Sequence, residues 1–267
     1  MSIQYKDATD TKTGPSPSVW GNCPVADFLE RPDTGLYQFD DFDRSPILTT
    51  PTITTQANYG NGYKAFGSSG GTIVPGTGQY GDIVLTETDD NEAVILADIN
   101  LPFKIIRGGG DVWFECRLKT NTITDARHGI FVGFVEQQTL AAIIPIVDAG
   151  TLADANFVGF HRLEGDGDKV DCIYKANGVT EVTVQADAAT LVADTYIKLG
   201  MRYKDANSTL YFYVDGAQVA SVVVIAAAGT DFPNDVTMGK CLAVKCASAD
   251  DAIVTMDWWG AAQARVS

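Results

Sequence analysis

The chain has 267 residues, of which 45% are hydrophobic and 20% are charged. This composition excludes a disordered chain, and a chain of this length buries enough surface to fold without a metal or a disulfide. Its 34 acidic and 19 basic residues give a formal net charge of −15, which repels phosphate backbones and anionic lipid headgroups. We therefore expect neither a nucleic acid nor a membrane as a partner.

The five cysteines are an odd number, and none forms a C-x-x-C pair or stands near a histidine at the spacing of metal ligands. We expect no disulfide framework. Residues 1–10 lack the apolar segment of a secretory signal, so we expect the protein to start in a cytoplasm.

Residues 1–35 form the least regular part of the sequence. They are rich in Thr, Asp, Pro and Gly, and the run Gly-Pro-Ser-Pro-Ser at 14–18 is expected to form neither a helix nor a central strand. This segment nevertheless carries Trp20, Phe28 and Leu29, which a solvated tail would not need. We predict an extended N-terminal arm that docks on a neighbouring subunit or on its own domain.

Residues 36–267 contain short apolar runs separated by Gly, Asn and Asp. In the run at 111–119, every second residue from Val112 to Leu118 is apolar, the period of a half-buried antiparallel strand. Comparable runs predict strands at 37–42, 81–86, 93–97, 130–135, 157–163, 170–174, 179–184, 196–203, 209–214, 218–225 and 253–259. Only residues 140–154 are expected to form a short helix or a long loop. The pattern predicts an all-β sandwich or barrel.

The dipeptide Asp215-Gly216 is the most specific local signal. Both residues tolerate the positive φ angles of a type I′ turn, and short β-type runs flank them. The pattern predicts a tight hairpin between strands at 210–214 and 218–222.

Seven segments of strand and turn residues follow one another along the chain: Tyr37–Phe42, Gly81–Thr86, Trp113–Lys119, Gly129–Phe134, Lys198–Tyr203, Tyr211–Gly216 and Val254–Trp259. In this order they resemble the concanavalin A-like (laminin-G-like) jelly-roll family, and within it the versions found in virion proteins of tailed bacteriophages. The resemblance covers about residues 36–262 and implies two antiparallel sheets packed face to face. It also implies that Asp40-Asp41-Phe42 lies near Asp257-Trp258-Trp259. The fold class predicted is thus an all-β, two-sheet jelly-roll sandwich with an extended N-terminal arm.

The carboxylates Glu87, Asp89 and Glu92 have a spacing that glycosidases of this fold use on a catalytic strand. The residues between them are turn formers, so the sequence favours a solvated hairpin loop. We expect no catalytic residues, and we expect that the chain is not an enzyme.

Two histidines, His128 and His161, are too few for a three-histidine zinc site, and a surface or hydrogen-bonded buried histidine is favoured for each. An acidic turn offers four carboxylates: Glu164, Asp166, Asp168 and Asp171. They could gather around calcium, but the turn lacks the spacing of an EF-hand, and a simple acidic turn is favoured. We expect no metal and no cofactor.

Aromatic side chains could form a platform for sugar rings: Trp113, Trp258 and Trp259, with Tyr59, Tyr63 and Tyr80. Trp258 and Trp259 are adjacent in a strand, so they point to opposite faces and only one can lie in the core. We expect the other beneath the arm or at an interface, in preference to a ligand platform. The candidate interface residues are Trp20, Phe28, Leu29, Trp258 and Trp259.

Two functional hypotheses follow from the residues and the resemblance. The first is a non-enzymatic virion structural protein, a phage capsid decoration or auxiliary head protein that forms homo-oligomers. It would contact the major capsid protein or neighbouring copies, and burial of Trp20, Phe28 and Leu29 against them would cement the shell. The alternative is a lectin-like carbohydrate-binding module of a phage tail or fibre, with host glycans as partners. Both hypotheses place the protein in the virion.

Overall fold

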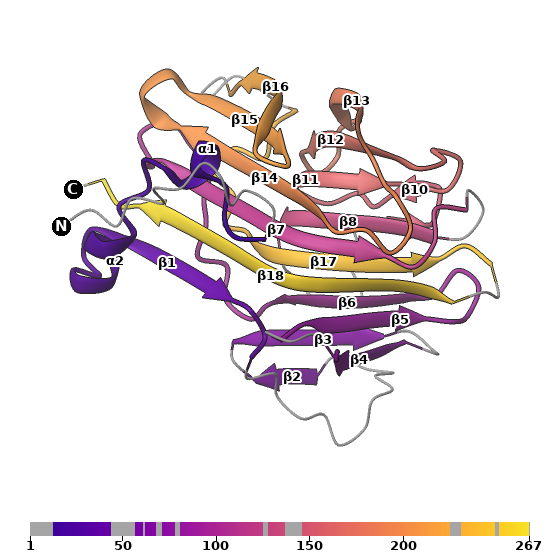
Figure 1. The fold of residues 1–267 in the computed structure, drawn as a ribbon. Coiled ribbons are helices and arrows are strands. Elements are labelled where there is room, and N and C mark those ends of the chain that lie inside the picture. The colour runs from indigo at the N-terminus through magenta and orange to yellow at the C-terminus, as the bar shows by residue number, and fades with distance from the viewer. Residues whose placement is uncertain are drawn as a thin grey trace.

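The computed structural model describes residues 13–43, 57–60, 62–67, 71–77, 81–124, 128–136, 146–224, 231–248 and 251–266. Two antiparallel sheets of eight strands each pack face to face, and short helices lie beside one of them (Figure 1). The predicted all-β sandwich is confirmed. No helix in the described part of the chain combines the length and the apolar character that a membrane span needs.

The first sheet contains β1 (Gly35–Asp40), β4 (Thr72–Pro75), β5 (Ile83–Glu87), β7 (Val112–Thr120), β14 (Ile197–Lys204), β15 (Thr209–Val214), β16 (Ala217–Val223) and β18 (Ala252–Ala264). Its strand order is β16-β15-β14-β7-β18-β5-β4, and β1 also pairs with β18. Asp40 stands opposite Trp259 in that pair, which confirms the implied closeness of the two segments.

The second sheet contains β2 (Ala57–Gly60), β3 (Tyr63–Gly67), β6 (Ala93–Asp98), β8 (His128–Val135), β11 (Phe157–Arg162), β12 (Lys169–Lys175), β13 (Val182–Thr190) and β17 (Gly239–Cys246). Its strand order is β13-β12-β11-β8-β17-β6-β3-β2. The remaining elements are β9 (Ile146–Asp148), β10 (Thr151–Leu152), α1 (Pro17–Trp20), α2 (Val25–Glu30) and the 3-10 helix η2 (Asp205–Asn207).

The predicted hairpin at Asp215-Gly216 is confirmed. Both residues have positive φ, at 48° and 78°, and Val214 stands opposite Ala217 in the ladder of β15 and β16. The turn chemistry in the sequence therefore fixes this register.

Two local predictions differ from the structure. The expectation that 14–18 forms no helix is wrong, because Pro17 occupies the first turn of α1, where its missing N–H costs nothing. Within 140–154, residues 146–152 contain the short strands β9 and β10, and residues 137–145 lie outside the described residues. The strands β2, β3, β4 and β17 were not predicted from the sequence.

The two inner faces form one large apolar core. The alternating residues of β7 from Val112 to Leu118 point into it, as predicted, together with Trp259 of β18. The expectation that this strand is half-buried is wrong, because Trp113 and Glu115 on its other face are buried as well. The outer face of the first sheet carries a separate apolar cluster, in which Trp113 of β7 and Ala262 of β18 pack against Val19, Trp20 and Phe28.

The described part of the N-terminal arm, residues 13–34, covers this outer face. Glu115, buried on β7, fixes it: the backbone N–H of Ser16 and Nε1 of Trp20 both donate to Glu115 Oε2, at 2.8 and 2.9 Å. Trp258 adds a third bond from Nε1 to the carbonyl of Thr13, at 2.7 Å. The arm therefore packs on its own domain. The boundary at residue 35 between arm and sandwich stays a prediction.

The outer face of the second sheet is covered by β9 and β10. Ile146 and Leu152 pack on an apolar cluster that includes Phe131 of β8 and Phe157 of β11. Nζ of Lys245 also donates to the carbonyl of Val147 in β9. Both sheets are thus apolar on both sides over much of their area.

Replacing Trp20 tests whether the arm contributes to the stability of the domain. Trp20→Ala removes a fully buried aromatic side chain and one of the donors to Glu115, so we expect the free energy of unfolding to fall by about 3–5 kcal/mol. Leu29→Ala is the matched control from the same segment, because Leu29 is 63% exposed, and should change it by less than about 0.5 kcal/mol. Equal effects in urea denaturation would contradict this role of the arm.

The stability of the domain should depend on pH through Glu115. Burial raises the pKa of this carboxyl, while the donors from Ser16 and Trp20 and the charge of Lys198 oppose the shift. The folded state then favours the protonated form, so this contribution is present below about pH 4.3, the ordinary pKa of glutamate, and is lost as pH rises through the folded pKa. Wild type should therefore lose stability relative to Glu115→Gln as pH rises from 4 to 8, measured by urea denaturation at each pH. A constant difference between the two proteins would contradict the raised pKa.

Candidate functional site

A pocket of about 380 Å³ lies where β1 of the first sheet approaches β3, β6 and β17 of the second. Its described lining residues are Leu29, Tyr37, Gln38, Phe39, Asp40, Gly62, Tyr63, Asp98, Asn100 and Lys240. We call it the Lys240 pocket. Its volume falls in the ordinary range of small-molecule sites, and polar and aromatic groups both line it.

Lys240 lies at the buried end of the pocket. It belongs to β17 on the same face as Leu242 and Val244, which point into the core, so its ammonium group is placed between the sheets. Nζ lies 3.1 Å from Asp98 Oδ1 and donates to Gln38 Oε1 at 2.6 Å. The backbone N–H of Lys240 also donates to Asp98 Oδ2, at 2.8 Å.

Burial shifts the pKa values of this ion pair. Desolvation lowers the pKa of Lys240 and raises that of Asp98, and in each case the charge of the partner opposes the shift. Lys240 also lies 5.3 Å from the ring of Trp259 and 5.8 Å from that of Tyr63, which face its positive charge. These contacts compensate for part of the desolvation of the ammonium group.

Aromatic groups form another part of the wall. Tyr63 accepts a hydrogen bond from Trp259 Nε1 at 3.0 Å, and burial raises the pKa of its hydroxyl. Phe39 of β1 is 38% exposed, and its ring stacks on Trp258, at 5.6 Å between ring centroids, on the outer face of the first sheet. The pocket therefore joins an exposed aromatic rim to a buried polar floor.

Lys240 and Asp98 were not among the residues predicted from the sequence. The sequence signal for this pair was the alternation of Lys240, Leu242 and Val244, which puts a lysine on the inward face of an otherwise apolar strand. A lysine buried in this way requires a carboxylate nearby. Asp98 follows directly on the predicted strand 93–97. The partner of a buried charge can lie far away in sequence, so the pairing itself was not visible.

The candidate interface residues occupy different environments. Trp20, Phe28 and Trp258 are buried between the arm and the first sheet, and Trp259 is buried in the core. Trp258 thus lies beneath the arm, one of the two positions expected for the tryptophan outside the core. Leu29 is the one member of the set that is exposed. Whether another chain contacts it stays a prediction.

The aromatic platform considered from the sequence is not assembled from its tryptophans. Trp113 is buried under the arm, together with Phe28, and Trp258 and Trp259 are buried as described above. Tyr63 is the member that lines the Lys240 pocket. The side chain of Tyr59 and all of Tyr80 lie outside the described residues.

The carboxylates Glu87, Asp89 and Glu92 do not face one cleft. Glu87 is fully buried, and its Oε1 accepts the N–H groups of Thr88 and Asp89 at 3.0 and 3.3 Å. Asp89 is exposed. Burial raises the pKa of Glu87.

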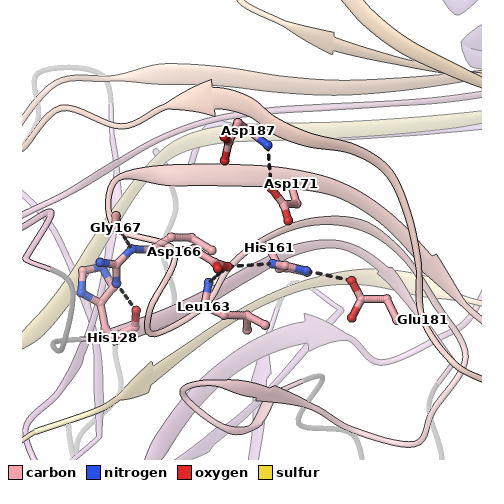
Figure 2. Close-up of polar contacts among 9 residues, drawn as sticks. His128, His161, Leu163, Asp166, Gly167, Asp171, Glu181 and Asp187 are labelled. Atoms are coloured by element: carbon pink, nitrogen blue, oxygen red, sulfur yellow. Dashed lines mark hydrogen bonds and ion pairs between the residues drawn. The ribbon is translucent and has the colours of Figure 1, made fainter.

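The two histidines are both buried. His128 lies close to Thr120, at 2.8 Å from Nε2 to Oγ1, and burial lowers the pKa of its ring to about 3. Of the four acidic-turn residues, Asp166 and Asp171 lie close to His161, whereas Glu164 and Asp168 are not part of that group (Figure 2).

Comparison with known proteins shows the fold of this chain. No family model matches the sequence, and no curated protein is similar to it. The structure is similar to an endo-1,3-beta-glucanase from Streptomyces sioyaensis (TM-score 0.55, 16% identity, 87% of this chain and 97% of that chain covered). It is also similar to peanut lectin (TM-score 0.54, 15% identity, 87% and 99%) and to the carbohydrate recognition domain of Emp46p (TM-score 0.51, 12% identity, 84% and 98%). The chain therefore has the concanavalin A-like, lectin-like jelly-roll fold.

The expectation that the chain is not an enzyme is corrected by the same comparison. The glucanase has this fold over nearly its whole length, so the architecture is shared by an enzyme and by lectins. At such low identity the likeness shows the fold alone. The absence of a glycosidase strand at Glu87 was thus too narrow a basis for excluding catalysis.

The ion pair in the Lys240 pocket should contribute far more than an exposed one. Lys240→Met leaves Asp98 buried without its counter-charge, and we expect the free energy of unfolding to fall by about 3–5 kcal/mol. The matched control is Lys104→Met, which breaks the exposed pair of Lys104 and Asp235 and should cost at most about 1 kcal/mol. Urea denaturation measures both. A similar cost for both variants would show that Lys240 is not desolvated as described.

Proposed function

We propose that the protein is a carbohydrate-binding module that binds a neutral saccharide in the Lys240 pocket. The observation that carries the proposal is the composition of the wall. Phe39, 38% exposed, offers aromatic surface for the apolar face of a sugar ring, while the amides of Gln38 and Asn100 and the carboxylate of Asp40 suit its hydroxyl groups.

The charges in the pocket favour a neutral ligand over an anionic one. Lys240 already has Asp98 and Gln38 as partners, so its ammonium group is not free to bind a carboxylate or a sulfate. Asp40 adds a further negative charge to the lining. The net charge of −15 on the whole chain disfavours an anionic polysaccharide as well.

The lectin-like fold is consistent with this function, since peanut lectin and a carbohydrate recognition domain share it. The sequence resemblance to phage virion proteins adds the proposal that the module is carried by a phage tail or fibre and binds host glycans. Capsid decoration has weaker grounds, because Trp20 and Phe28, two of the three residues proposed to clamp neighbouring subunits, are buried within their own chain.

Glycan binding by rim variants tests the proposal. The full chain should bind a subset of neutral oligosaccharides on a glycan array, and Phe39→Ala and Asn100→Ala should each weaken that binding by roughly tenfold, because each removes a stacking or hydrogen-bonding group worth about 1–1.5 kcal/mol. Calorimetry with the best oligosaccharide gives the affinities.

The matched control is Val223→Ala, which changes another exposed apolar residue, 61% exposed and placed on β16 at the far side of the first sheet. It should leave binding unchanged. Binding that is insensitive to both rim variants, or specific for anionic glycans, would contradict the proposal. Analysis of the bound oligosaccharide for cleavage products distinguishes a catalytic site from a lectin-like one.

A further inference from the structure

A second polar cluster surrounds the ring of His161 on β11 (Figure 2). In the second sheet, β8 separates β11 from β17, which carries Lys240. The ligand atoms of His161, Asp166 and Asp171 all lie within 4.8 Å of one another. Asp171 stands directly opposite His161 in the ladder of β11 and β12, and Asp166 lies in the turn that joins these strands. His161 is only 3% exposed, whereas the two aspartates are partly accessible.

The orientation of the His161 ring is set by a third carboxylate. Nε2 lies 2.9 Å from Glu181 Oε1, and because a carboxylate can only accept, Nε2 is the donor. Nδ1 is buried, has no hydrogen-bond partner and lies 4.0 Å from Asp166 Oδ2. In the neutral ring, the Nδ1 lone pair therefore faces the carboxylates. A carboxylate behind the other ring nitrogen is the usual arrangement of a metal-binding histidine.

The backbone holds the two aspartates in place. Nε of Arg162 donates to the carbonyl of Gly167 at 2.8 Å, which fixes the turn that carries Asp166. Asp171 Oδ1 accepts the backbone N–H of Asp187 at 2.8 Å, which leaves its other oxygen for a ligand. The backbone N–H of Leu163 also donates to Asp166 Oδ2, at 3.2 Å, so each of the two carboxylates accepts a backbone N–H.

We propose that His161 Nδ1, Asp166 and Asp171 bind one divalent transition-metal ion, with zinc as the best fit. In tetrahedral geometry, zinc bonds of about 2.0–2.2 Å place neighbouring ligand atoms about 3.3–3.6 Å apart. The three ligand atoms, which lie within 4.8 Å of one another, therefore close by up to about 1.5 Å when the ion binds. Calcium fits less well, because it prefers six to eight oxygen ligands and one donor here is nitrogen. A dication also offsets the three carboxylates that surround a single imidazole. The proposal does not depend on saccharide binding.

Zinc titration of the full, untagged chain tests the site. After treatment with EDTA and dialysis, calorimetry at neutral pH should show one zinc ion bound per chain with a dissociation constant in the micromolar range or below, and weaker binding of calcium. Background binding should be low, because all five cysteines and His128 are buried. Asp166→Asn and Asp171→Asn should each weaken zinc binding by roughly tenfold or more.

The control for these variants is Asp168→Asn, in the same turn. Asp168 pairs with Lys169 at 3.1 Å and is not one of the three proposed ligands, so this change should leave zinc affinity within about twofold of wild type. Circular dichroism and melting of the metal-free proteins check that each variant folds. Because two ligand variants are used, the second still tests the proposed site if the first misfolds.

Two results would overturn the proposal. One is the absence of saturable zinc binding in the wild-type chain. The other is that the Asp166→Asn and Asp171→Asn variants bind zinc as strongly as the Asp168→Asn variant.

Discussion

The structure depends on burying both faces of both sheets. The two inner faces cover each other, but each outer face needs a cover of its own, because Trp113 on one sheet and Phe131 on the other are as buried as residues of the central core. The arm supplies the first cover and the strands β9 and β10 supply the second. The arm therefore completes the fold of its own sandwich, and Glu115 fixes its position by accepting from both Ser16 and Trp20.

Both candidate sites lie where these covers end. The Lys240 pocket lies beside β1, an edge of the first sheet, and Leu29 of α2 contributes to its wall. The His161 cluster follows the end of β11, where the N–H of Glu164 donates to the carbonyl of Ala149 next to β10, at 2.7 Å. At such borders a side chain has apolar neighbours on one side and access to solvent on the other. This combination orients polar groups rigidly while a ligand can still reach them.

The sequence predicted the features that depend on local periodicity and turn chemistry. The alternation in β7 and the Asp215-Gly216 turn are examples, and both are confirmed. It failed for β17, because the apolar run of this strand is only four residues long, 241–244, between Lys240 and Lys245. Lys240 was missed with it. The grouping of His161 with Asp166 and Asp171 was also not predicted, because it depends on the register of β11 and β12, which places Asp171 opposite His161.

The balance of acidic and basic groups differs between the two sites, although the chain as a whole has a net charge of −15. Lys240 has its counter-charge within the chain, so that pocket can use its remaining polar groups for an uncharged ligand without leaving an ion unpaired. Around His161 the balance is reversed, because Asp166, Asp171 and Glu181 outnumber the single ring that they surround. An excess of buried or half-buried carboxylate is costly unless a cation accompanies it. The carboxylates around His161 thus differ from the exposed acidic residues of other turns, such as Asp89 and Asp90, which water solvates.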